Sequence, residues 1–230
     1  MTGEAPGGRP TRRRLSAAAR RETILTAAIR AFAGAGYDQV RIADIAAEVG
    51  VTEPVVFQNF GTKADLFAAV LDRTADDFAR HLTALADQED DVAALLARML
   101  APERLDRLHN RGNLGALFID PSARADERIQ RGARQAITRL AEALAQLLAR
   151  GQADGSIRDD TEPITLAWYV LSLLQARQFR RTHTATPSPA LEHALLTAAL
   201  DMLHTPNGDS DEAAARGEEP GGTTALEDSA

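Results

Sequence analysis

Apolar residues recur at helical spacing along most of the chain, and no stretch shows the sustained alternation of a β-strand. In the first predicted helix, residues 17–33, the apolar positions run from Ile24 to Phe32, and Gly34 and Gly36 end the pattern. Further helices are predicted near 41–48, 52–58, 63–84, 91–109, 112–119, 122–152, 161–182 and 188–204. The pattern predicts an all-α fold, and Thr62 followed by Asp65 predicts a capping box at the start of the helix near residue 63.

The two short helices near 41–48 and 52–58 are spaced as in a helix-turn-helix. Small Ala46 allows close approach, and Gly50 stands where a tight turn needs a residue that tolerates positive φ. Thr52 can cap the second helix, and Val56 and Phe60 then point inward. A helix-turn-helix places its second helix in the DNA major groove, although this spacing also fits an ordinary helical hairpin.

The two ends of the chain differ in composition from the helical part. Residues 1–16 contain the run RPTRRR and predict a disordered basic arm, and residues 206–230 predict a disordered acidic tail. The first 63 residues hold 9 basic and 6 acidic side chains, a net charge of +3, whereas the remainder carries −10, so the whole chain carries −7. Local charge governs the encounter with a polyanion, yet charge alone favours a solvated surface over a binding site.

Several classes of protein are disfavoured by features that the sequence lacks. The chain has no cysteine, no apolar run long enough to span a membrane and no apolar segment behind its basic start, so we expect a cytoplasmic protein. It has no phosphate-loop, zinc-protease or nucleophile-elbow motif, and its five histidines lack metal-ligand spacing. We therefore expect no catalytic residues, no metal, no cofactor and no enzymatic activity.

A wider stretch, from Arg20 to Leu71, resembles the N-terminal domain of TetR-family transcriptional regulators. The matching features are AGAGY at 33–37, IADIAAEVGVT at 42–52 and VFQNFGTKADLF at 56–67. The resemblance implies a three-helix helix-turn-helix DNA-binding domain at 17–66. It also implies that residues 67–205 form a C-terminal helical bundle for ligand binding and dimerisation.

The sequence departs from the family pattern at three positions. Phe57 stands where tyrosine is usual and has no hydroxyl to donate to a phosphate. Asn59 stands where histidine or tyrosine is frequent, and its amide can still donate. Arg41 stands where threonine usually caps the second helix; arginine is a poor cap but a strong phosphate ligand, and a merely solvated Arg41 stays open as an alternative.

The resemblance divides the candidate DNA-binding residues into two groups. Lys63, Arg41, the helix N-termini and the arginine arm are placed to hold phosphates. The outward residues of the second helix are free to read bases, and a reading helix without arginine should depend less on guanine. The predicted set is Arg41, Thr52, Glu53, Pro54, Val55, Phe57, Gln58, Asn59 and Lys63.

The body is expected to control DNA binding. By analogy with the family, the helices near 161–182 and 188–204 pair across a two-fold axis to form a homodimer. A pocket between about 91 and 178 is expected to bind an unidentified small molecule that is apolar or flexible, with Trp168 and Gln175 facing the cavity. The candidate pocket residues are Met99, His109, Asn113, Phe118, Trp168 and Gln175.

The expected function is sequence-specific binding of a double-stranded DNA operator by a repressor that a small-molecule ligand releases. The alternative is a helix-turn-helix activator, or a protein that organises DNA without a small-molecule inducer. The sequence does not separate the two.

Overall fold

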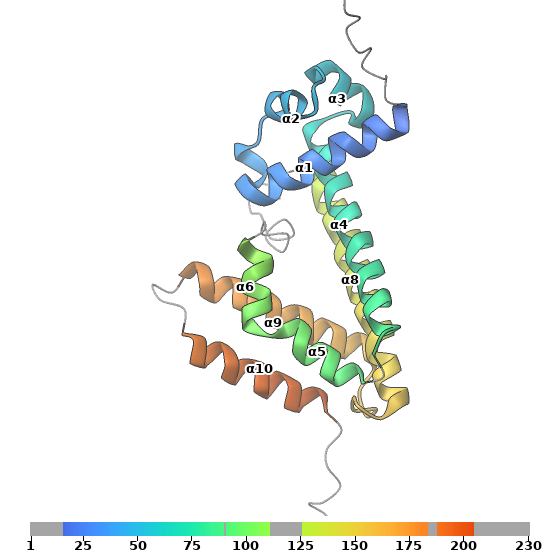
Figure 1. Cartoon of the computed structure of the whole chain (residues 1–230), viewed down its shortest axis with the longest axis vertical. Helices are drawn as coiled ribbons and strands as arrows, with labels where there is room; N and C mark the ends of the chain where they lie inside the picture. Colours follow the sequence, from blue (N-terminus) through green and yellow to red (C-terminus); the bar gives the residue numbers. More distant parts are fainter. Residues whose placement is uncertain (1–15, 90, 111–125, 184–187, 205–230) are drawn as a thin grey trace, which may run out of the picture.

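The computed structural model describes residues 16–89, 91–110, 126–183 and 188–204. Its helices form a head, a long stem and a lower layer (Figure 1). The head contains α1 (Ala17–Gln39), α2 (Ile42–Val49) and α3 (Glu53–Phe60), and the stem pairs α4 (Lys63–Ala86) with α8 (Glu127–Asp154). The lower layer contains α5 (Val92–Leu100), α6 (Pro102–Asn110), α9 (Pro163–His183) and α10 (Pro189–Leu203). The predicted all-α fold is confirmed.

Local signals in the sequence account for the ends of the first and fourth helices. The Ser16 hydroxyl accepts a hydrogen bond from the amide of Ala19 at 3.1 Å and caps α1. Near its C-terminal end α1 is kinked at Gly36, whose φ of 79° is accessible to glycine at little cost. The predicted capping box of α4 is confirmed, because the Asp65 amide donates to the Thr62 hydroxyl at 3.1 Å and the Thr62 amide donates to the Asp65 carboxylate at 2.9 Å.

The stem helices contribute to both of the hydrophobic cores in the described chain. In the head core, Phe32 and Phe67 meet edge to face with ring centroids 5.0 Å apart. The same two stem helices supply Leu82 and Leu148 to the core of the lower layer. A shift of either stem helix must therefore disturb both cores. The predicted domain boundary at 66/67 stays a prediction, and buried residues of the head core continue along α4 to Ala75.

The structure corrects two predicted helices. The first was expected to end before Gly34 and Gly36, but α1 continues through both glycines to Gln39 with a kink at Gly36. The segment expected as a single helix at 91–109 is two helices, α5 and α6, separated at Ala101, which has an extended ψ of 130°. The residue before a proline is disfavoured in the helical region, and Pro102 follows Ala101 directly. The predicted helix at 112–119, residues 1–15 of the predicted arm and the predicted tail at 206–230 lie outside the described residues.

None of the described helices combines the length and the apolar character needed to cross a membrane.

Candidate nucleic-acid interface

The turn between α2 and α3 has the geometry predicted from its sequence. Gly50 adopts a left-handed conformation with φ 70° and ψ 35°, and its amide donates to the carbonyls that end α2. The amide of Val51 donates to the Ala46 carbonyl at 2.9 Å. Ala46 and Val56 are almost fully buried between the helices. The short Ala46 side chain and the glycine turn thus set the angle between α2 and α3.

The outward surface of α3 carries polar and apolar side chains without a basic residue. Thr52 occupies the N-cap position, but its hydroxyl makes no capping hydrogen bond and stays available. Pro54 lies in the first turn, where a missing amide proton costs no helical hydrogen bond. Phe57 is 41% exposed, a large value for a phenylalanine. The exposed predicted residues of this surface are Thr52, Glu53, Pro54, Phe57 and Gln58, with Val55 half-buried.

Asn59 does not share this outward orientation. Its side-chain amide donates to the Val55 carbonyl at 2.6 Å within the same helix, and the residue is half-buried. The Asn59 carbonyl in turn accepts a hydrogen bond from Arg21 of α1. The expectation that Asn59 points outward is therefore corrected: its amide already has an acceptor inside the head.

Arg21 is a residue of the head that the sequence analysis missed. Its guanidinium lies 4.0 Å from the centroid of the Phe60 ring and bonds the end of α3. It thereby fixes α3 against α1. The sequence contains only a weak signal for this packing role, because an arginine pair such as the one that contains Arg21 is also common on a solvent-exposed surface.

Arg41 precedes α2 and is paired with Asp44. Its Nε and one NH2 nitrogen donate to the two carboxylate oxygens at 3.0 and 2.9 Å, and it makes no cap bond. The hydrogen bond from Arg41 lowers the pKa of Asp44 below its ordinary value. Arginine has five N–H donors, so this pairing leaves donors for a phosphate while holding the guanidinium in one orientation. Both side chains are largely exposed.

Lys63 makes contacts inside the head. Its ammonium lies 4.6 Å from the Tyr37 ring centroid and donates to the Asp38 carbonyl at 3.3 Å. Lys63 therefore ties the start of α4, directly after the α3 turn, to the end of α1. The half-buried position leaves part of the side chain accessible to solvent. A phosphate contact by Lys63 stays a prediction. The structure shows in addition that Lys63 helps to hold the helices of the head together.

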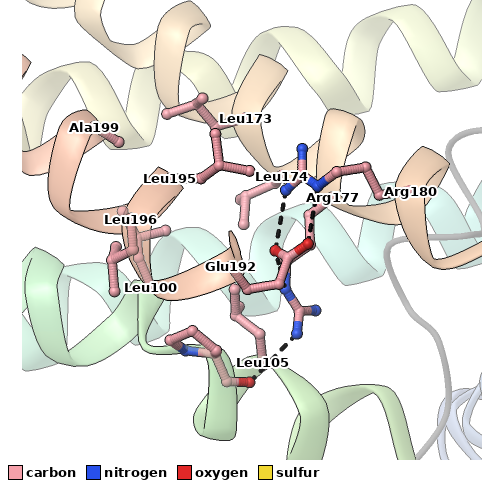
Figure 2. Close-up of a pocket in the computed structure, with 11 residues that line it drawn as sticks. Leu100, Leu105, Leu173, Leu174, Arg177, Arg180, Glu192, Leu195, Leu196 and Ala199 are labelled. Carbon is pink, nitrogen blue, oxygen red and sulfur yellow. Dashed lines mark hydrogen bonds and ion pairs between the residues drawn. The ribbon is translucent and has the colours of Figure 1, made fainter. Parts of the chain in front are cut away.

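A second candidate site is a pocket between α5, α6, α9 and α10 (Figure 2). Leucines form most of its wall, and charged side chains stand at one end. Glu192 of α10 is nearly buried and pairs with Arg180 of α9 at 2.8 and 3.0 Å. This hydrogen bond lowers the pKa of the Glu192 carboxyl, so the carboxylate stays ionised at neutral pH. The lining residues are Leu100, Pro102, Leu105, Leu173, Leu174, Arg177, Arg180, Glu192, Leu195, Leu196 and Ala199.

Of the six residues predicted for the ligand site, the three whose side chains are described, Met99, Trp168 and Gln175, do not line this pocket. Trp168 is 45% exposed and Gln175 is exposed, so the expectation that both face a cavity is corrected. A different face of α9, with Leu173 and Arg177, lines the pocket instead. The reason is that α5, α6 and α10 pack on that face, which the sequence of α9 alone does not reveal.

The other four predicted pocket residues divide into two groups. Met99 packs against the core of the lower layer. His109 lies on α6, but its side chain is outside the described part of the structure, as are Asn113 and Phe118 entirely. Among the described residues, no group of three or more histidine, aspartate or glutamate side chains is placed to hold a metal ion.

Comparison with known proteins gives a consistent set of matches. Residues 24–70 match the profile of the family described as bacterial regulatory proteins, tetR family. The HTH-type transcriptional repressor AcnR of Corynebacterium diphtheriae is 30% identical over 161 residues, which cover 67% of this chain and 77% of that protein. The HTH-type transcriptional repressor Rv1474c of Mycobacterium tuberculosis is 29% identical over 186 residues, covering 81% and 91%.

A solved structure matches over a similar length. The transcriptional regulator FadR from Bacillus subtilis in complex with stearoyl-CoA has a TM-score of 0.61 with 16% identity, and the match covers 80% of this chain and 99% of that one. At this identity the likeness shows the fold alone. The matching proteins named here are regulators rather than enzymes.

Proposed function

This chain belongs to the TetR family of bacterial regulatory proteins, and from that premise we propose that it is a repressor which a small-molecule ligand releases from its operator. That it is a DNA-binding transcriptional regulator follows from the family, whose members bind operator DNA as dimers. The single observation that carries the proposal is the surface of α3, where a helix-turn-helix presents Thr52, Glu53 and Gln58 to solvent. A protein that binds operator DNA acts in the cytoplasm, where the chromosome lies.

The side chains of the reading surface suit adenine, the thymine methyl and cytosine rather than guanine. Gln58 suits bidentate hydrogen bonding to adenine, and apolar groups such as the Phe57 ring suit the thymine methyl. Glu53 can accept from the amino group of cytosine. Without arginine on α3, the commonest specific contact to guanine is not available from this helix.

Phosphate contacts would come from groups around α3. Arg41 is exposed, and its pairing with Asp44 orients the guanidinium at the start of α2, beside the helix N-terminus. Such contacts position the protein on the duplex and carry no sequence information. Arg41 is therefore expected to contribute affinity with a strong dependence on salt concentration.

The surface of the lower layer supports a homodimer through α9 and α10. Large exposed apolar side chains of the described body gather on these two helices: Ile164, Trp168, Phe179, Leu191 and Met202. Exposed apolar groups on adjacent helices are typical of an interface between subunits. A two-fold axis through this face would give two copies of α3, as two half-sites about 34 Å apart require.

The stem supports the release step. Because α4 and α8 belong to both cores, a ligand that displaces the lower layer also displaces the head. Arg128 of α8 lies 3.6 Å from Asp65, the acidic member of the capping box of α4, and so adds a polar link between stem and head. A ligand can shift this equilibrium only through its different affinity for the two arrangements.

The test is footprinting on the DNA upstream of the protein's own gene, with and without candidate ligands. Two symmetric protected half-sites that are lost on addition of a ligand are the expected result. Light scattering should show a dimer at micromolar concentration. A protein that stays monomeric on and off DNA contradicts the proposal, and symmetric binding that no ligand changes favours the activator or DNA-organising alternative.

A further inference from the structure

The pocket between α9 and α10 has two ends of different chemistry (Figure 2). At one end Leu173, Leu195 and Leu196 form an apolar wall. At the other end the lining includes the guanidiniums of Arg177 and Arg180 and the carboxylate of Glu192, which together carry a net positive charge. A molecule that complements both ends has an aliphatic tail and an anionic head.

Arg177 has one buried donor that is ion-paired but not hydrogen-bonded. Its side chain is only 12% exposed, and its NH2 nitrogen donates to Asp106 of α6 at 2.7 Å. Its Nε is buried and has no hydrogen-bond partner among the described residues, although the Glu192 carboxylate lies 3.3 Å away. The Arg177 Nε is therefore held by an ion pair that lacks hydrogen-bond geometry, whereas nearly all buried donors in folded proteins make a hydrogen bond. A carboxylate bound in the pocket would give it a well-aligned acceptor.

The size of the pocket limits the tail. Its free space is about 50 Å³. One water-sized group needs roughly 10–15 Å³ on this measure, so the space accepts about three to five non-hydrogen atoms, and a carboxylate with its tail enters fully only as α10 moves away from α9. A drug-sized ligand needs a pocket of roughly 300 Å³ or more, which excludes one here unless the helices separate.

We propose that this pocket binds a short aliphatic monocarboxylate, with its tail among the leucines and its carboxylate at Arg177. This inference rests on the proposed function, since it names the chemical class of the releasing ligand. Glu192 belongs to α10, and its carboxylate already pairs with Arg177 and Arg180. A second carboxylate repels Glu192 and competes for the same guanidiniums, which pushes α10 away from α9. Because α10 carries part of the proposed dimer face, that displacement changes the spacing of the two reading heads.

The first experiment measures binding without DNA. Calorimetric titration of the full-length protein with butanoate and hexanoate should show saturable binding, whereas 1-butanol and 1-hexanol should bind at least tenfold more weakly. Arg177→Gln should weaken carboxylate binding at least tenfold. Leu196→Phe, which fills the apolar end without touching the arginines, should weaken hexanoate more than butanoate.

A matched control removes one positive charge elsewhere. Arg150 of α8 is exposed, pairs with Asp87 and is not part of the pocket lining. Arg150→Gln should bind both carboxylates as the wild-type protein does. If alcohols bind as well as carboxylates, or if Arg177→Gln and Leu196→Phe, shown to be folded by circular dichroism, bind both acids with wild-type affinity, the proposal is overturned.

The second experiment separates this inference from the proposed function. The same acids are added to the protein–operator complex, and release is followed by fluorescence anisotropy of labelled DNA. Carboxylate binding with operator release supports the proposal. Operator binding without any carboxylate binding overturns this inference and leaves the regulator intact, whereas carboxylate binding by a protein that binds no operator overturns the proposed function alone. Carboxylate binding that leaves the operator complex unchanged overturns the assignment of this class as the releasing ligand.

Discussion

Replacing Trp168 by alanine should weaken the homodimer while leaving each subunit folded. Trp168 lies on the exposed face of α9 and is 45% exposed in the single chain. A tryptophan buries up to about 250 Å² when fully covered, so about 110 Å² of this side chain remains for a partner to cover. At about 25 cal/mol per Å², that area contributes about 2.8 kcal/mol.

The symmetry of the dimer doubles the effect. A two-fold interface contains the same residue from each subunit, so the full loss is about 5–6 kcal/mol if both rings are completely covered. Each 1.4 kcal/mol corresponds to a factor of ten, so the dimer dissociation constant should rise about 10⁴-fold, and about 10²-fold if only half the area is covered. Sedimentation of dye-labelled protein from nanomolar to micromolar concentration measures this change.

Phe57 offers a matched control at the other end of the molecule. It is 41% exposed, close to the value for Trp168, but it lies on α3. Phe57→Ala should leave the dimer constant unchanged and weaken operator binding at every protein concentration. Trp168→Ala should weaken operator binding only at concentrations where its dimer has dissociated. A Trp168→Ala protein with the wild-type dimer constant would refute the assignment of this face of α9.

Three further predictions address the reading helix, the packing of the body and its charged contacts. Gln58→Ala should relax the preference at one base pair in each half-site by about 1–3 kcal/mol, whereas Lys63→Ala should weaken binding to all sequences alike. Chemical denaturation should also show that Lys63→Ala lowers the free energy of unfolding by about 1–2 kcal/mol. Gly151→Ala should destabilise the protein by about 1–3 kcal/mol, because the added Cβ would lie 2.9 Å from a valine Cβ of α5. Gly34→Ala should stabilise α1 by up to about 1 kcal/mol, because nothing lies within 4 Å of the added Cβ. The urea midpoints of the two variants test both predictions. The hydrogen bond from Arg180 lowers the pKa of Glu192 in the folded protein from its ordinary value of 4.5. The stability that Glu192 contributes is therefore present above that ordinary value and is lost as pH falls through the folded pKa, so Glu192→Gln should flatten the fall of the urea midpoint below about pH 5.

The helix-turn-helix could be predicted because its determinants are local. Ala46, Gly50 and Val56 lie within eleven consecutive residues, and their roles depend on helical periodicity and on the left-handed conformation that glycine tolerates. The capping box of Thr62 and Asp65 is equally local, since it joins residues three positions apart. The sequence by itself therefore determined the all-α fold, the turn and the exposure of Thr52, Glu53 and Gln58, but not the orientation of Asn59.

Contacts between residues distant in sequence decided the rest. Arg21 and Asn59 are 38 positions apart, and only the packing of α1 on α3 shows that they bond. Both faces of α9 carry enough apolar residues to be buried, so its periodicity did not reveal which one the rest of the chain covers. The tertiary structure decided it, because α5, α6 and α10 pack on the face that holds Leu173 and Arg177 and leave Trp168 outside. A helix specifies its own amphipathic faces, but the elements that pack on it determine which face becomes interior.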